Sequence, residues 1–185
     1  GLEMLNVQSG EKVLEIGFGT GHALPILTRA AHPAKIYGID LSEKMCALSR
    51  KKLKLAKLDN FANLQKGDAA QLPYKKNSFD VIFISFTLEL FDTPEIPTVL
   101  SESLRVLKEN GRLGLVSLAK RDSHAVHIYE YFHRIMPKAV DCRPIYAKKS
   151  LEKAGYQILK NKELKMWGLP VSILLAQKQK NSSLN

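Results

Sequence analysis

Short runs of apolar and β-branched residues alternate with longer segments of helical periodicity along most of the chain. The runs predict strands at residues 12–16, 35–40, 61–67, 79–85 and 112–118. Apolar residues three and four positions apart predict helices after residue 22, from the N-cap Ser42 to about Leu58, and from the N-cap Thr93 to a stop at Asn110-Gly111. Such alternation is typical of right-handed crossovers between parallel strands.

The C-terminal third changes this pattern. It predicts helices at 123–136 and 149–154, the second closed by Gly155, and then strands at 156–166 and 171–177 around a Gly168-Leu169-Pro170 turn. We therefore expect an α/β fold with a doubly wound, mostly parallel seven-stranded sheet and a C-terminal antiparallel hairpin. Residues 1–178 are expected to form a single domain, and residues 179–185 a flexible tail.

The turn after the first strand contains three glycines at every second position, Gly17, Gly19 and Gly21. A strand that enters such a turn and continues into a helix presents backbone without side chains, and unpaired N–H groups, to a ligand. A dinucleotide fingerprint has its third glycine three residues after the second, but His22 stands there. The spacing favours a ligand other than a dinucleotide, and a plain tight turn is the alternative.

Polar residues follow the next strands at their carboxyl ends, where ligands bind in a doubly wound sheet. Asp40 ends the second strand and is suited to accept both hydroxyls of a ribose, although it is also a good turn or helix cap. Asp68 can accept from an adenine amine while the Ala69 N–H donates to a ring nitrogen. Ser85 ends the fourth strand. We expect these residues to meet the glycine turn in one crevice.

Three further residues complete the candidate cofactor site. Glu15 lies inside an otherwise apolar strand, so its carboxylate requires donors, which the glycine turn or a ligand ammonium can supply. Leu41 and Met45 lie at the start of the next helix and can cover an adenine ring; ordinary core packing is the alternative for both.

The sequence resembles the class I S-adenosylmethionine-dependent methyltransferases, especially the ubiquinone/menaquinone-biosynthesis branch and its type 11 relatives. The resemblance rests on the segments VLEIGFGTG, IYGIDLSEKM, GDAAQLPYKKNSFDVIFISFTLELF, EIPTVLSESLRVLKENGRLGLVSL and LEKAGYQI. It implies the Rossmann-like fold of that class and S-adenosylmethionine as the methyl donor. It also implies cofactor-binding roles for Glu15, Gly17, Gly19, Thr20, Gly21, Asp40, Leu41, Met45, Asp68, Ala69 and Ser85.

Two features depart from the family pattern. Family members usually carry N-terminal helices that cap the cofactor and substrate, whereas 12 residues precede Val13 and the first residue is Gly1. A fragment that lacks the capping segment and a chain without one are both open alternatives. The quinone branch tends to have an Arg-Asn pair after the fourth strand, where this chain has Thr87-Leu88-Glu89-Leu90.

The catalytic residues are not identified by any diagnostic pattern. Methyl transfer from a sulfonium depends largely on positioning, and a base is needed only when the acceptor must lose a proton. The candidates are Glu89, His127, His133 and Asp141, each with a plain surface or structural alternative. Two cysteines, Cys46 and Cys142, form no metal-ligand spacing or disulfide framework, which suits a cytoplasmic protein without a metal.

The formal net charge of +10 favours contact with anionic partners, although a solvated basic surface is the simpler reading. The charge could mark a nucleic-acid methyltransferase, but residues 85–88 lack the Asn/Asp-Pro-Pro-aromatic motif of many such enzymes. A catalytically inactive S-adenosylmethionine-binding module is a further alternative. We expect a methyltransferase for a small-molecule or lipid-like acceptor, quinone or phospholipid related, with peripheral contact to an anionic membrane. The oligomeric state is not indicated.

Overall fold

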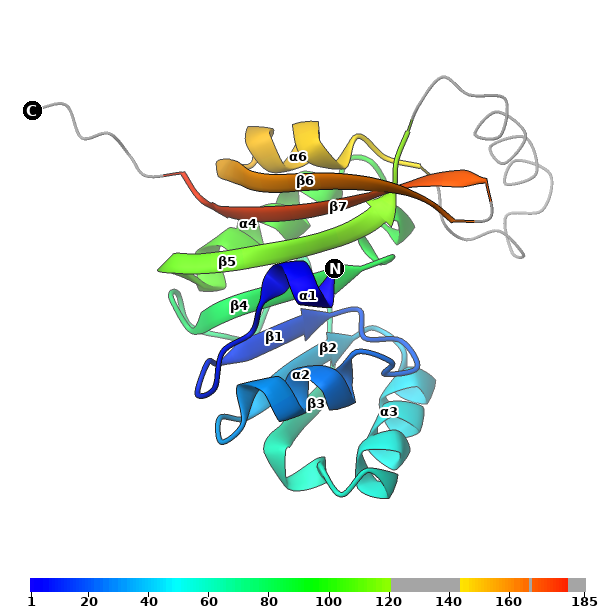
Figure 1. The fold of residues 1–185 in the computed structure, drawn as a ribbon, viewed down its shortest axis with the longest axis vertical. Helices are drawn as coiled ribbons and strands as arrows, with labels where there is room; N and C mark the ends of the chain where they lie inside the picture. Colours follow the sequence, from blue (N-terminus) through cyan, green and yellow to red (C-terminus); the bar gives the residue numbers. More distant parts are fainter. Residues whose placement is uncertain (121–143, 167, 180–185) are drawn as a thin grey trace, which may run out of the picture.

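The chain forms one seven-stranded sheet in the order β3-β2-β1-β4-β5-β7-β6 (Figure 1). The computed structural model describes residues 1–120, 144–166 and 168–179. The strands are β1 (Val13–Ile16), β2 (Ile36–Asp40), β3 (Ala62–Lys66), β4 (Phe79–Ser85), β5 (Leu107–Leu118), β6 (Tyr156–Met166) and β7 (Leu169–Lys178). Pairing is parallel from β3 to β5 and antiparallel for β5–β7 and β7–β6. The predicted α/β fold and the closing hairpin are confirmed.

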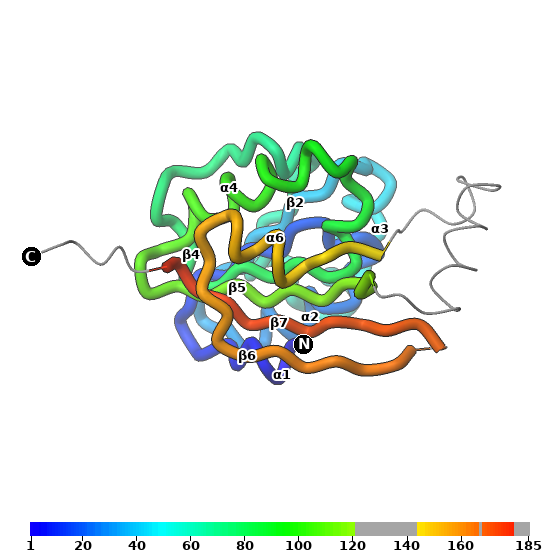
Figure 2. The backbone as a smooth tube through the Cα atoms, turned by 90° about the horizontal axis from the view of Figure 1, so that it is seen from above, coloured from blue at the N-terminus to red at the C-terminus, as the bar shows by residue number. Residues whose placement is uncertain are grey.

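Helices cover both faces of this sheet (Figure 2). They are α1 (Leu2–Leu5), α2 (Leu24–Ala31), α3 (Glu43–Leu55), α4 (Ile96–Val106) and α6 (Ala147–Lys153), with 3-10 turns η1 (Asp59–Phe61) and η2 (Leu88–Leu90). One buried apolar cluster joins the sheet to α4 and α6, and the other joins it to α1, α2 and α3. The side chains of β4 are mostly buried because helices lie on both of its faces, as its nearly unbroken apolar run predicts.

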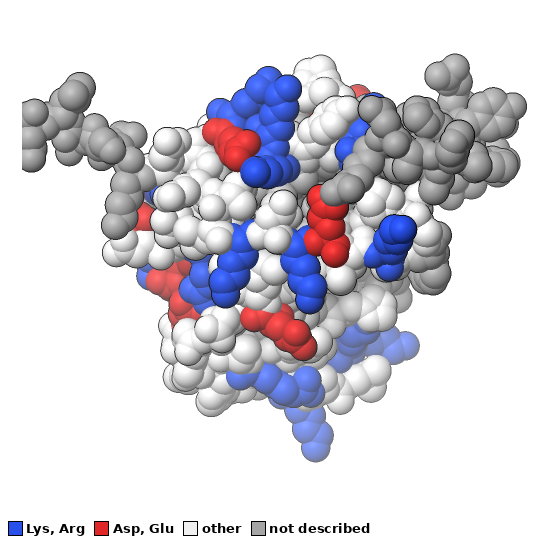
Figure 3. Space-filling model, turned by 45° about the horizontal axis from the view of Figure 1, so that its top comes forward, with Lys and Arg blue, Asp and Glu red and all other residues white. Residues whose placement is uncertain are grey.

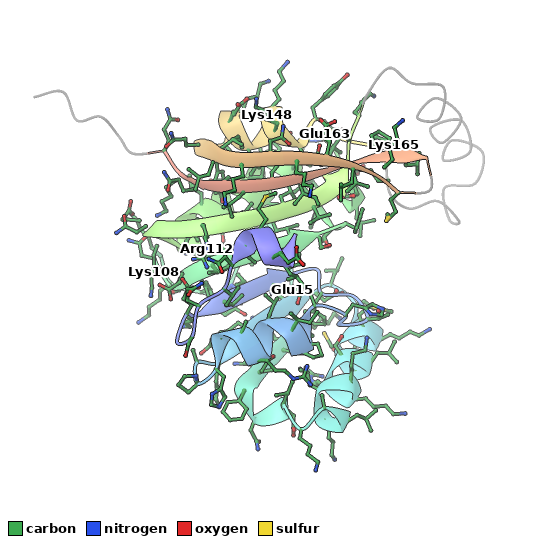
Figure 4. The ribbon with its side chains drawn as sticks, in the orientation of Figure 1. Glu15, Lys108, Arg112, Lys148, Glu163 and Lys165 are labelled. Carbon is green, nitrogen blue, oxygen red and sulfur yellow. The ribbon has the colours of Figure 1, made fainter. Side chains whose placement is uncertain are left out.

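Charged residues of both signs cover the face that carries α6 and β6 (Figure 3). On the opposite side of the sheet, Arg112 of β5 holds the first helix in place (Figure 4). Its guanidinium donates to the carbonyl oxygens of Leu5 and Asn6 at 2.6 and 2.7 Å and to both carboxylate oxygens of Glu11 at 2.7 and 2.8 Å. The short α1, which the sequence pattern did not predict, is thereby fixed on β5.

The predicted start of α4 is wrong. A helix beginning at Pro94 would need an N–H at residue 97 to bond the Thr93 carbonyl, and Pro97 has none. Thr93 makes no capping bond; residues 92–95 form a turn in which Glu95 N–H donates to the Asp92 carbonyl at 2.8 Å. The helix therefore begins at Ile96, with Pro97 in its first turn, where a missing N–H costs little.

The predicted helix stop at Asn110-Gly111 is also wrong. α4 ends at Val106, and β5 begins at Leu107 and runs through both residues. The β4–β5 register shifts between the Phe79–Leu107 and Val81–Arg112 pairs. A Cβ at Gly111 would lie 2.9 Å from the Asp80 carbonyl oxygen, so glycine allows the irregular strand to approach β4.

Smaller differences concern the ends of other elements. α3 ends at Leu55 rather than near Leu58, and α6 begins at Ala147 rather than at Lys149. β7 begins at Leu169, so Leu169 and Pro170 belong to the strand rather than to the turn. The helix predicted at 123–136 and the tail from residue 180 lie outside the described residues. In the described part, no helix is long and apolar enough to cross a membrane.

Candidate functional site

A pocket of about 970 Å³ opens at the carboxyl ends of β1, β2 and β4. The strand order reverses between β1 and β4, which is where doubly wound sheets bind their ligands. The loop from β1 to α2 forms one wall, and the start of α3 and residues 67–69 after β3 form the next. The segment from Ser85 to Phe91 after β4 contributes the remaining wall.

The glycines of the β1–α2 loop have different structural causes. Gly17 (φ 68°) leaves no room for a side chain, because a Cβ there would overlap the side chain of Thr87. Gly19 (φ 51°) has open space at its Cβ position and faces the pocket, so a ligand can approach its backbone closely. Gly21 does not line the pocket; a Cβ there would lie 2.5 Å from Ser49 Oγ of α3.

Asp40 joins the glycine loop to the end of β2. One of its carboxylate oxygens accepts from Gly19 N–H at 2.8 Å, and the other accepts from Ser42 N–H at 2.9 Å. Asp40 therefore does cap the turn after β2, as the alternative interpretation of this residue predicts. Asp40 also lines the pocket, and a carboxylate offers about four acceptor positions. Two of them stay available for a ligand.

Glu15 is the buried carboxyl group of the site (Figure 4). It lies on β1, is 4% exposed and lines the pocket, and its Oε2 has no hydrogen-bond partner. Burial, with a smaller contribution from the nearby Asp40 charge, raises the pKa of Glu15 to about 8. A buried carboxyl without a partner is costly, so this atom is suited to a cationic ligand group that enters the pocket.

Asp68 and Ala69 lie beyond the end of β3. Asp68 caps its own turn, since its Oδ1 accepts from Ala70 N–H at 2.8 Å. Ala69 is buried, whereas Asp68 is exposed at the pocket. Across from them, Leu41 is 71% exposed and lines the pocket, so core packing does not explain it. Met45 lines the pocket and also packs against the apolar cluster under α3. It is therefore a core residue that is also placed to contact a ligand.

The wall after β4 has a strained backbone. Phe86 has a φ of 49°, a left-handed conformation that is uncommon for a residue with a bulky side chain. The Phe86 N–H donates to the Val116 carbonyl at 2.8 Å. The hydroxyl of the following residue, Thr87, donates to the carbonyl oxygens of Gly17 and Ser85 at 3.0 and 2.9 Å. These bonds hold the strained turn against the glycine loop.

Glu89 lies on η2, directly behind this wall. It is 1% exposed; its Oε1 accepts from Leu118 N–H of β5 at 3.1 Å, and its Oε2 has no partner. Burial raises the pKa of Glu89 to about 7. Glu89 is not among the residues that line the pocket, although its neighbours Thr87 and Leu90 are. In the part of the chain that the structure describes, Glu89 is therefore a buried residue whose hydrogen bond connects η2 to β5.

The pocket brings together most of the residues predicted to bind a cofactor. Its lining includes Glu15, Gly17, Gly19, Thr20, Asp40, Leu41, Met45, Asp68, Ala69 and Ser85, but not Gly21. The catalytic candidates His127, His133 and Asp141 lie outside the described residues. Sequence reasoning missed the wall formed by Phe86, Thr87, Leu90, Phe91 and Glu95. The signal was available for four of them, because Phe86, Thr87, Leu90 and Phe91 lie within six residues of the end of a predicted central strand.

Comparisons with known proteins agree with this geometry. Residues 14–115 match the family described as "Methyltransferase domain". A demethylmenaquinone methyltransferase from Lactobacillus johnsonii is 31% identical over 135 residues, which cover 72% of this chain and 54% of that protein. The enzyme of the same name from Geobacillus stearothermophilus is 36% identical over 139 residues, 74% of this chain and 58% of that protein. The chain thus spans little more than half the length of these curated relatives.

A solved structure, an S-adenosylmethionine-dependent methyltransferase from Methanosarcina mazei, has the same fold. Its TM-score is 0.78 at 19% identity, and the match covers 96% of this chain and 97% of that one. The family match covers more than half of the chain, and it includes the glycine loop, Asp40, Asp68 and the wall after β4. The chain therefore belongs to the methyltransferase domain family of class I S-adenosylmethionine-dependent methyltransferases.

Proposed function

We propose that the pocket binds S-adenosylmethionine and that the protein transfers its methyl group to a small, apolar organic acceptor related to the quinones. The observation that carries the proposal is the set of carboxylates at three adjacent strand ends, Glu15, Asp40 and Asp68, around the open backbone at Gly19. The demethylmenaquinone methyltransferase names of the relatives support the quinone-related acceptor.

The residues present fit this cofactor. The remaining acceptor positions of Asp40 suit the two ribose hydroxyls, and Asp68 with the Ala69 N–H suits the adenine edge. The unpartnered Glu15 Oε2 suits the ammonium of the methionine portion, and Leu41 can cover the adenine ring. When bound, S-adenosylmethionine supplies an activated methyl group on a sulfonium, so the protein contributes mainly orientation and exclusion of water.

The wall after β4 supports an apolar acceptor. Phe86, Leu90 and Phe91 line the pocket there, and 52% of Leu90 is exposed. A pocket of about 970 Å³ lies at the upper end of the usual range for one ligand, roughly 300–1,000 Å³. It therefore has room for a cofactor and a ring-sized acceptor side by side.

The charge of the pocket gives no support to the nucleic-acid alternative. Among its described lining residues, four are carboxylates and none is Lys or Arg, although the chain has a net charge of +10. A nucleic-acid enzyme requires cations where phosphates pass.

Two measurements test the proposal. Titration calorimetry with S-adenosylhomocysteine, S-adenosylmethionine and NAD should show binding of the first two, and tighter binding of NAD would refute the cofactor assignment. Transfer of a labelled methyl group to a demethylated naphthoquinol, with a short RNA as the competing acceptor, tests the substrate class. Methylation of the RNA in preference to the naphthoquinol would refute the acceptor.

A further inference from the structure

Three leucines on α3 and directly before it are exposed at seven-residue intervals. Leu41, Leu48 and Leu55 are 71%, 42% and 78% exposed. Seven residues are nearly two helical turns, so Leu48 and Leu55 share one face of α3, whereas Leu41 precedes the extended N-cap Ser42 and lies outside the helix. Single exposed leucines are common on proteins, but two of them on the same face of one helix form an apolar stripe that marks a contact surface.

The same face carries lysines between the leucines. Lys44, Lys51 and Lys52 occupy it by helical position, and none of them forms an ion pair with the part of the chain that the structure describes. The acidic residue of α3, Glu43, is paired with Arg50 at 3.5 Å. We call Lys44, Leu48, Lys51, Lys52 and Leu55 together the α3 face.

The rest of α3 explains why this face is unpartnered. The helix packs on the sheet through Cys46, Ser49 and Leu53, which are buried. Its core contact is therefore made by the opposite side, and the exposed leucines add nothing to it. An exposed face that combines leucines with lysines has the composition of helices that lie in the interface of a membrane.

We propose that the α3 face docks on an anionic lipid bilayer. The leucines enter the apolar boundary of the headgroup layer, and the lysines meet the negative surface potential. A second copy of this chain is a poor occupant, because pairing two such faces brings Lys44, Lys51 and Lys52 against like charges. α6 and β6 carry six lysines, but Glu152 and Glu163 lie among them and Glu152 is 3.9 Å from Lys148, so charges of both signs meet there, whereas the α3 face has no acidic residue (Figure 3).

The position of Leu41 gives this contact an orientation. Leu41 lines the pocket and lies three residues before Lys44, so the α3 face begins beside the pocket mouth and a bilayer held by this face lies next to it. If the acceptor is lipid-like, it can enter from the membrane without crossing water. This last step rests on the proposed function, but the docking itself does not.

Vesicle flotation tests the docking. We expect the protein to float with vesicles of phosphatidylglycerol mixed with phosphatidylcholine and to stay unbound with phosphatidylcholine alone. The triple variant K44Q/K51Q/K52Q should bind the anionic vesicles roughly a hundredfold more weakly, at about fivefold for each lysine. The matched control is K148Q/K149Q/K153Q on α6, which changes the net charge equally at the opposite end of the sheet (Figure 1).

A second pair of variants tests the leucines. Leu48→Asn with Leu55→Asn should weaken vesicle binding, whereas Leu159→Asn with Leu164→Asn, which are 44% and 47% exposed on β6, should not. Calorimetry with S-adenosylhomocysteine on every variant separates this proposal from the cofactor assignment, because the substitutions avoid the pocket. The docking proposal is refuted if the protein does not bind anionic vesicles, or if a control variant loses as much binding as the matching α3 variant. It is also refuted if the leucine variant binds vesicles like the wild type, or if the α3 face forms a dimer instead.

Discussion

Replacing Glu15 with glutamine should stabilise the empty protein at neutral pH while weakening ligand binding. Burial raises the pKa of this carboxyl from 4.5 to about 8, so at pH 7 the empty pocket holds it protonated. The unfolded chain would be ionised at the same pH. Folding therefore takes up a proton at pH 7, and glutamine removes that cost with nearly the same shape.

The magnitude follows from proton linkage. Each pH unit above the unfolded pKa costs the folded state about 1.36 kcal/mol until the folded pKa is reached. Because the folded state binds the extra proton, the contribution of Glu15 to stability is fully present below pH 4.5 and is lost as pH rises toward 8. At pH 7 we expect E15Q to be more stable by at most about 3 kcal/mol, or roughly 5–10 °C in the thermal midpoint.

The assay is thermal unfolding of both proteins from pH 5 to pH 8, together with calorimetry. The difference between them should be small at pH 5 and grow with pH, while S-adenosylhomocysteine binds E15Q more weakly. Glu95→Gln, at an exposed carboxylate on the same pocket, is the control and should change the midpoint little. A lower midpoint of E15Q at every pH would refute the reasoning, since it would mean that the carboxylate stabilises the fold.

Three further predictions follow from the site. Asp40→Ala should weaken S-adenosylhomocysteine binding by about 1.5–3 kcal/mol in calorimetry, and an unchanged affinity with a lower thermal midpoint would make Asp40 a structural cap only. Because burial raises the pKa of Glu89 to about 7, E89Q should reduce the loss of thermal stability that the wild type shows between pH 5 and pH 7, leaving the part caused by Glu15; an unchanged pH slope would contradict this. Gly17→Ala should cost several kcal/mol in denaturant unfolding, more than Gly10→Ala, which shares a positive φ but meets no atom; equal costs would show that only φ matters.

Local patterns were sufficient for the existence of the strands, although β5 begins at Leu107 rather than at Arg112, and for the carboxylates that meet in the pocket. The β-branched run at 79–85 had the observed bounds of β4, and Asp40 and Asp68 follow strands whose carboxyl ends must meet at one edge. The start of α4 depended on Pro97, whose missing N–H outweighed the cap-like Thr93-Pro94 pair. The missing N–H of Pro97 is visible in the sequence and by itself predicts the later start of the helix.

Other features depend on contacts between distant residues, which no local pattern reveals. Gly21 carries the family motif, yet its glycine requirement comes from Ser49, twenty-eight residues later. Similarly, the left-handed Phe86 is held by Val116 on the neighbouring strand. Local preference alone would not assign that conformation to phenylalanine.

The two backbone bonds of Asp40 have a consequence for the speed and cost of recognition. The carboxylate holds Gly19 N–H and Ser42 N–H in the empty protein, so the glycine loop is fixed in one shape before any ligand arrives. The conformational entropy of ordering that loop is lost during folding rather than during binding. A ligand that uses the free acceptor positions of Asp40 displaces neither bond, and its encounter with the loop requires no rearrangement there.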